Sequence, residues 1–198
     1  MLFLFTILLQ AIISVAQNDK RPITPPVLHT ERTKWVDSVI ASLTLEQKIG
    51  QLFMVAAYSG GEKYNKFLID SLIQKYHIGG LIFMQGTPSA QATLCNEYQR
   101  SSKIPLFIAM DAEWGLGMRL TGVRDFPRQL MMGAMQDSNL VYNLASAIAN
   151  QCRRMGVHIN FAPVADINNN PNNPVINFRS FGEQKNKVAN YAIQYMRG

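Results

Sequence analysis

A regular alternation between short apolar runs and longer amphipathic stretches constrains the fold of this chain more than any other feature. Short apolar runs are typical of buried strands, whereas apolar residues three and four positions apart are typical of helices. The expected strands are 52–57, 81–84, 106–110 and 159–162, and the expected helices are 62–76, 88–100, 139–155 and 183–197. Four strand-then-helix units in series predict an α/β fold with parallel strands and right-handed crossovers.

Local signals support the expected helix ends. Residues 35–43 place their apolar side chains on one helical face, and Thr44 follows as a candidate N-cap. Gln47 stands three residues after Thr44, which completes a capping-box pattern. Pro88 suits the first turn of a helix, and Gly156 suits the residue after a helix end.

Parallel strands joined by helices fit either a doubly wound sheet or a barrel, and the local pattern does not separate these two architectures. A doubly wound nucleotide-binding fold has a G-x-G-x-x-G motif after its first strand. The sequence after 52–57 is Tyr58-Ser59-Gly60-Gly61, and no phosphate-loop lysine motif occurs. The sequence therefore offers no nucleotide-binding motif.

The last expected strand leads into a long polar loop, residues 158–183, with the sequence HINFAPVADINNNPNNPVINFRSFGE. Pro163 has no N–H to donate to a ladder, so regular pairing should stop there. Asparagine and aspartate side chains bond nearby backbone, which allows a long loop to be ordered. α/β barrels carry their chemistry on such loops after parallel strands. A solvated surface loop is the alternative interpretation.

Three segments of the sequence, in this order, resemble glycoside hydrolase family 3. They are LTLEQKIGQL at 43–52, IPLFIAMDAE at 104–113 with Arg119-Leu120 behind it, and NFAPVADINNNPNNPVI with RSFGE at 160–183. The resemblance covers roughly residues 35–198. It implies a (β/α)8 TIM-barrel type, of which residues 34–198 would form a partial domain: about the first half, with four to five β/α units.

The resemblance also implies a sugar pocket. Asp111 directly follows an expected strand and matches the family residue that accepts bonds from sugar hydroxyls, a role that suits a carboxylate. Arg119 and Arg179 each match an arginine of that pocket; a surface arginine, or one that pairs with Asp111, is the alternative. Asp166 is expected to tie the asparagine-rich loop together, with sugar contact as its second role.

Three further residues at these positions have less specific interpretations. Glu113 has the chemistry of a general acid or base, but the matching acid of the family is structural or peripheral. Trp114 replaces a glycine of the family pattern, where an aromatic ring could stack on a sugar or narrow the entrance. His158 precedes a strand and is interpreted as a packed histidine.

The expected activity is hydrolysis of terminal β-linked sugars by a retaining enzyme like bacterial β-N-acetylhexosaminidase, with β-glucosidase or a non-catalytic sugar-binding remnant as alternatives. Retaining glycosidases need two catalytic groups beside the bond. The family's Lys-His-x-x-Gly-His-Gly segment and its later aspartate nucleophile do not occur in the sequence. No catalytic residue is therefore assigned; the nucleophile and the acid/base are expected beyond residue 198. The chain alone is expected to be inactive.

The N-terminal residues predict export. Residues 1–16 form an apolar segment that ends in Ser14-Val15-Ala16, typical of a signal peptide, and residues 17–33 read as a polar, proline-containing linker. An uncleaved anchor or a late start codon are the alternatives. A periplasmic, secreted or cell-surface location follows, with no stable membrane span after cleavage. The substrate is expected to be a carbohydrate, and a cell-wall-derived glycoside is one candidate.

Charge and cysteine content exclude several other classes. The formal net charge is +6, but the lysines and arginines are scattered, so no nucleic-acid partner is predicted. The two cysteines, Cys95 and Cys152, stand far apart in expected helices and are interpreted as buried free thiols, with a disulfide between them in an exported protein as the alternative. No metal-ligand spacing occurs, and neither a metal nor a cofactor is expected.

Overall fold

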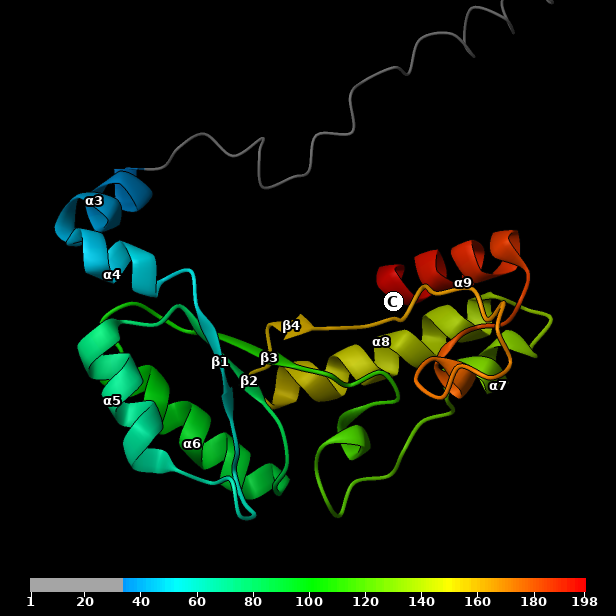
Figure 1. Cartoon of the computed structure of the whole chain (residues 1–198), viewed down its shortest axis with the longest axis horizontal. Coiled ribbons are helices and arrows are strands. Elements are labelled where there is room, and N and C mark those ends of the chain that lie inside the picture. Colours follow the sequence, from blue (N-terminus) through cyan, green and yellow to red (C-terminus); the bar gives the residue numbers. More distant parts are fainter. Residues whose placement is uncertain (1–33) are drawn as a thin grey trace, which may run out of the picture. The chain divides into compact units, whose positions relative to one another are not determined.

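Four parallel strands form one sheet in the order β1-β2-β3-β4, in a computed structural model that describes residues 34–198 (Figure 1). The strands are β1 (Met54–Ala57), β2 (Gly80–Phe83), β3 (Phe107–Met110) and β4 (Ile159–Asn160). Each strand pairs with the next one along the chain, and the order never reverses. A doubly wound sheet must reverse its strand order, so this topology is that of consecutive barrel strands.

The expected signal peptide, 1–16, and linker, 17–33, lie outside the described residues. The chain divides into two units, and the first of these, Met1–Leu43, includes helix α3 (Lys34–Ser42). The second unit, Thr44–Gly198, contains the sheet and all the remaining elements. No helix within residues 34–198 is both long and apolar enough to cross a membrane.

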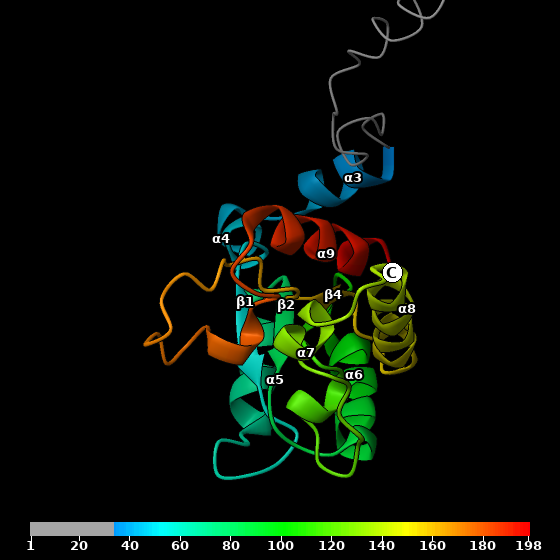
Figure 2. The same cartoon turned by 90° about the vertical axis from the view of Figure 1, so that its right-hand side faces the viewer.

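The four helices expected after the strands are present, and the structure adds the short helix α7 (Gln129–Gly133), which the sequence did not predict. The other helices of this unit are α4 (Leu45–Gly50), α5 (Lys66–Tyr76), α6 (Pro88–Ser101), α8 (Asn139–Arg154) and α9 (Lys185–Arg197), with 3-10 turns η1 (Leu116–Met118) and η2 (Asn177–Arg179). The capping box at Thr44 and Gln47 is confirmed, and Pro88 occupies the first turn of α6. Helices α8 and α9 pack side by side in both views (Figure 2).

Several elements are shorter than expected, and three of them have a local reason. Helix α5 begins at Lys66 instead of residue 62, because the side chain of Asn65 caps it by accepting from Leu68 N at 3.0 Å. Strand β1 begins two residues late, because Leu52 still bonds back to the end of α4. Strand β4 ends at Asn160, where its carbonyl turns to accept from the amide of Ala162, and Pro163 follows.

The core lies between the sheet and its helices. Its largest fully buried apolar side chains include Phe83 and Met110 from the strands and Tyr98 and Ile148 from the helices. Apolar burial of this kind is the main stabilising term in a parallel α/β unit.

Both cysteines are buried and free, which confirms the interpretation from sequence. Burial raises the pKa of Cys95 to about 12 and also raises the pKa of Cys152. Because the thiolate is the reactive form, these thiols are poor nucleophiles in the folded protein.

Candidate functional site

The sheet register brings the chain segments that follow β3 and β4 to one edge. Met110, the last residue of β3, lies opposite Phe83 of β2 and Asn160 of β4. Asp111 therefore leaves the sheet at the edge where the carboxyl ends of all four strands lie. In α/β barrels this edge carries the functional residues.

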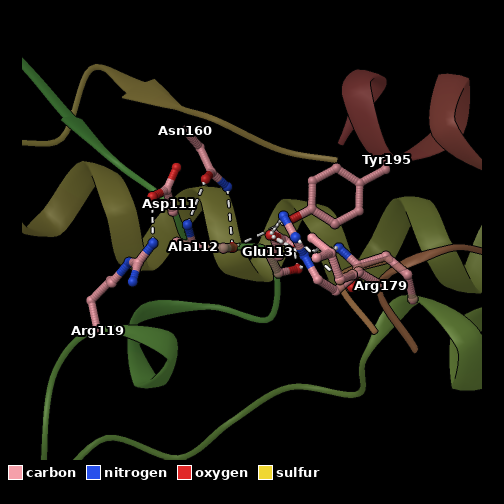
Figure 3. A network of polar contacts seen from close by, with 9 residues as sticks. Asp111, Ala112, Glu113, Arg119, Asn160, Arg179 and Tyr195 are labelled. Atoms are coloured by element: carbon pink, nitrogen blue, oxygen red, sulfur yellow. Dashed lines mark hydrogen bonds and ion pairs between the residues drawn. The ribbon is translucent and has the colours of Figure 1, made fainter. Parts of the chain in front are cut away.

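Asp111 and Arg119 form an ion pair at this edge, between Arg119 Nη2 and one carboxylate oxygen of Asp111 (Figure 3). The chain between them turns back through η1, and Gly115 permits the turn with a φ of 87°. A Cβ at Gly115 would lie 2.6 Å from the ring of Phe126. The side chains of Arg119 and Asp111 are 20% and 26% exposed, so solvent still reaches the pair.

This ion pair leaves polar atoms without a partner. The second carboxylate oxygen of Asp111 points away from Arg119 in Figure 3 and makes no hydrogen bond with the residues described. Arg119 Nε is buried and likewise finds no acceptor within the same part of the chain. The site therefore has a free acceptor on Asp111, and Arg119 keeps a buried donor without a partner.

A second ion pair joins Glu113 to Arg179, which comes from η2 far along the chain. Arg179 donates from Nε to both carboxylate oxygens at 3.0 and 3.1 Å and from Nη2 to Oε1 at 2.7 Å. Glu113 is only 2% exposed, whereas Arg179 is 30% exposed. The hydrogen bonds to Glu113 raise the pKa of the Arg179 guanidinium, and the charges of Glu113, Asp111 and Asp166 add to this effect.

Three side chains from other elements hold the backbone between these two acidic residues. Asn160 accepts from Ala112 N at 2.9 Å and donates to Ala112 O at 3.3 Å, which continues the sheet pairing with a side chain (Figure 3). The Tyr195 hydroxyl donates to Glu113 O at 3.1 Å, and Gln129 Nε2 lies 3.4 Å from the Glu113 carboxylate. Burial raises the pKa of Tyr195, so its hydroxyl remains a donor.

The asparagine-rich loop is ordered by its own side chains, as predicted. Asn170 accepts from the amide of Asn172, and Asn173 accepts from the amides of Val175 and Ile176 at 2.9 and 3.2 Å. The loop is closed at its base, where Ser180 Oγ donates to the main-chain carbonyl of Asp166 at 2.5 Å. The main-chain carbonyl of Asp166 thus holds the base of the loop together, and the Asp166 side chain is exposed to solvent.

Residues 44–198 match the family model described as "Glycosyl hydrolase family 3 N terminal domain". This match covers well over half of the chain. The chain belongs to glycoside hydrolase family 3.

Curated relatives in family 3 include the Beta-N-acetylglucosaminidase/beta-glucosidase of Cellulomonas fimi, which is 27% identical over 87% of this chain. The Beta-hexosaminidase A of Pseudoalteromonas piscicida is 33% identical over 65% of the chain. The chain spans 30% and 24% of the lengths of these two proteins.

A solved family 3 beta-N-acetylglucosaminidase from Paenibacillus sp. str. FPU-7 aligns over 79% of the chain and 31% of its own length. It is 38% identical, with a TM-score of 0.70. The beta-glucoside phosphorylase BglX aligns over 89% of the chain and 31% of its own length with a TM-score of 0.79; at 24% identity it shows the fold alone. These neighbours confirm that the four β/α units are part of a family 3 TIM barrel.

The structure does not bring all four binding residues predicted from sequence together, and some of them are engaged by other side chains. Asp111 and Arg119 lie together, while the guanidinium of Arg179 is engaged by Glu113 and not by Asp111. Sequence reasoning missed Asn160 and Tyr195, which position the residues after β3. Asn160 ends a strand in the family signature, which was a usable signal, whereas Tyr195 belongs to an ordinary apolar helix face.

His158 and Trp114 have roles that the geometry defines. His158 Nδ1 accepts from Ile108 N at 3.0 Å, and its ring packs edge-on against Phe107, so it is a structural histidine at the opposite end of β3. Trp114 lies under the guanidinium of Arg128, 4.7 Å from the ring centre. Within residues 34–198 no three His, Cys, Asp or Glu residues gather into a metal site.

Proposed function

We propose that residues 44–198 supply part of the sugar-binding rim of a glycoside hydrolase that acts on terminal β-linked sugars of the N-acetylhexosamine type. Support comes from the family match and from relatives described as N-acetylglucosaminidases and hexosaminidases. The observation that carries the proposal is the partly buried Asp111–Arg119 pair at the carboxyl end of the sheet, with its free carboxylate oxygen.

In this proposal each polar side chain has a distinct task. The free oxygen of Asp111 accepts a sugar hydroxyl, because an ionised carboxylate makes strong charge-assisted bonds. Arg119 holds that carboxylate in place and donates to a second sugar oxygen. Arg179 and Asp166 border the same rim from the asparagine-rich loop. Glu113 engages Nε and Nη2 of Arg179, and Nη1 donates to Val175 O at 3.4 Å, which leaves the second N–H of Nη1 for the ligand.

Binding, and not bond cleavage, is the task of these carboxylates. A retaining glycosidase needs a nucleophilic carboxylate free to attack the sugar carbon and a second group that delivers a proton. Asp111 is paired with Arg119, and Glu113 is buried beneath Arg179. We therefore infer that the nucleophile and the acid/base lie outside residues 44–198, in a longer protein comparable in length to the relatives.

A β-glucosidase of the same family is the second candidate. The Cellulomonas fimi relative is named for both activities, which makes a sugar without a 2-acetamido group the alternative ligand for this rim. A sugar-binding module without catalysis is a third reading. The sugar that the rim prefers separates the first two candidates.

Titration of the purified 198-residue chain with N-acetylglucosamine and with glucose, followed by NMR, tests the proposal. We expect millimolar binding of N-acetylglucosamine, weaker binding of glucose, and no hydrolysis of an aryl β-N-acetylglucosaminide. Tighter binding of glucose would select the β-glucosidase. The absence of binding by a folded chain, or turnover by the chain alone, would contradict the assignment of roles.

We further propose that the protein is exported and meets a cell-wall-derived glycoside outside the cytoplasm. The motivation is the apolar segment 1–16 with its Ser14-Val15-Ala16 end. Expression in a bacterial host with N-terminal sequencing of the exported fraction is the test. A mature chain that starts at Gln17 is expected, and a chain that keeps residues 1–16 in the cytoplasm would exclude export.

A further inference from the structure

Beside the buried ion pair lies a second contact between the same parts of the chain. The guanidinium of Arg128 lies 4.7 Å from the ring centre of Trp114 and 4.6 Å from that of Phe178. The two rings meet edge to face, with their centres 6.2 Å apart. We call Trp114, Arg128 and Phe178 the aromatic clamp.

Each member of the clamp is the sequence neighbour of Glu113 or of one of its two side-chain partners, Arg179 and Gln129. Trp114 follows Glu113, and Phe178 precedes Arg179. Arg128 precedes Gln129, whose amide lies 3.4 Å from the Glu113 carboxylate. The segment after β3, the start of α7 and the end of the asparagine-rich loop are thus joined twice, once by the ion pair and once by the clamp.

The clamp differs from the ion pair in its exposure. Arg128 is exposed and Phe178 is 39% exposed, so the clamp closes the outer side of the contact while Glu113 and Arg179 close its buried side. Among the described residues the Arg128 side chain forms no ion pair and no hydrogen bond, and its guanidinium lies over the two rings. A cation over an aromatic face is attracted by the ring quadrupole, and the flat guanidinium of arginine stacks well there.

We infer that Arg128 is a positioning residue: it holds Phe178, and with it Arg179 and the asparagine-rich loop, against the segment that carries Asp111. Arg128 covers one face of the Trp114 ring, so that face serves the loop contact. That this contact positions Arg179 for a sugar rests on the proposed function. That Arg128 orders the asparagine-rich loop does not.

Hydrogen–deuterium exchange of the sugar-free chain tests this inference. Each ring contact of an exposed cation is worth roughly a two- to fivefold change in an equilibrium constant. Arg128→Leu removes both cation–ring contacts and should accelerate exchange in residues 163–182 by at least about fivefold, whereas Phe178→Leu removes one and should accelerate it at least about twofold. Because the two variants share the Arg128–Phe178 contact, the effect of the double variant should fall short of the product of the two single effects. Residues 80–83 should exchange as in the unaltered chain.

Two matched variants sharpen the result. Arg124→Leu removes an exposed arginine of the same segment that touches neither ring, and should leave exchange unchanged. Arg128→Lys keeps the charge without the flat group, and should give intermediate exchange in residues 163–182. A lysine variant that exchanges like the leucine variant would overturn the cation–aromatic account.

The remaining outcomes also decide the matter. Unchanged loop exchange in Arg128→Leu, or strictly additive effects of the two leucine variants, would overturn the inference. Acceleration that extends to residues 80–83 would do the same, since the residue would then support the whole sheet and not the loop. If the unaltered chain fails to bind N-acetylglucosamine, the proposed function falls, but the exchange result stands.

Discussion

Replacement of Arg179 by methionine is expected to lower the free energy of unfolding of the chain by about 3 kcal/mol. The substitution leaves the Glu113 carboxylate, which is 2% exposed, without its cationic partner. A buried charge that loses its partner carries its desolvation cost uncompensated. Because Arg179 is itself 30% exposed, water screens part of the pair, and the expected loss lies at the lower end for buried pairs. Urea unfolding followed by circular dichroism measures it.

A double variant and a surface pair control this experiment. Glu113→Leu combined with Arg179→Met removes both charges, so it should be more stable than Arg179→Met alone. Lys66→Met breaks the exposed pairs of Lys66 with Asp70 and Glu97 and should cost less than about 1 kcal/mol. The side chains of Lys66, Asp70 and Glu97 are 38%, 29% and 39% exposed. An Arg179→Met chain that unfolds within 1 kcal/mol of the unaltered chain would show that the pair contributes little.

Replacement of Asp111 by alanine should reduce kcat/KM at least about tenfold in an active protein that contains this domain. The substitution removes the free acceptor proposed for a sugar hydroxyl and also leaves the partly buried Arg119 guanidinium without its carboxylate. Loss of a hydrogen bond to a charged group costs roughly 1.5–3 kcal/mol, and about 1.4 kcal/mol is a factor of ten. Steady-state hydrolysis of an aryl β-N-acetylglucosaminide provides the measurement.

The neighbouring arginine serves as the matched control. Arg124→Ala alters an exposed residue of the same segment, outside the family signature, and should leave kcat/KM nearly unchanged. If a well-folded Asp111→Ala protein kept its full kcat/KM, Asp111 would be a structural partner of Arg119 and the proposed rim would be wrong. Equal losses in both variants would indicate a general disturbance of the segment.

The sequence by itself determined the order and type of the elements, because their signals are local. Apolar periodicity predicted the four β/α units, and the Thr44–Gln47 capping box and Pro88 marked helix starts that the structure confirms. The asparagine spacing likewise predicted an ordered loop, since each side chain bonds backbone only two or three residues away. The errors at Lys66 and Asn160 concern boundaries, where one capping or turning bond decides the end.

Only the tertiary structure decided which charges face one another. Two acids, Asp111 and Glu113, stand two residues apart, and two arginines lie further along the chain, so the sequence allowed either pairing. The turn at η1 brings Arg119 back to Asp111, while the closed asparagine-rich loop delivers Arg179 to Glu113.

Burial then assigned the two acids different roles. Glu113 is enclosed beneath Tyr195, Gln129 and Arg179, whereas one oxygen of Asp111 stays free at the edge of the sheet. These contacts join residues up to 82 positions apart. Local sequence patterns do not predict such long-range contacts. The contacts form only when the parallel strands bring their carboxyl ends together.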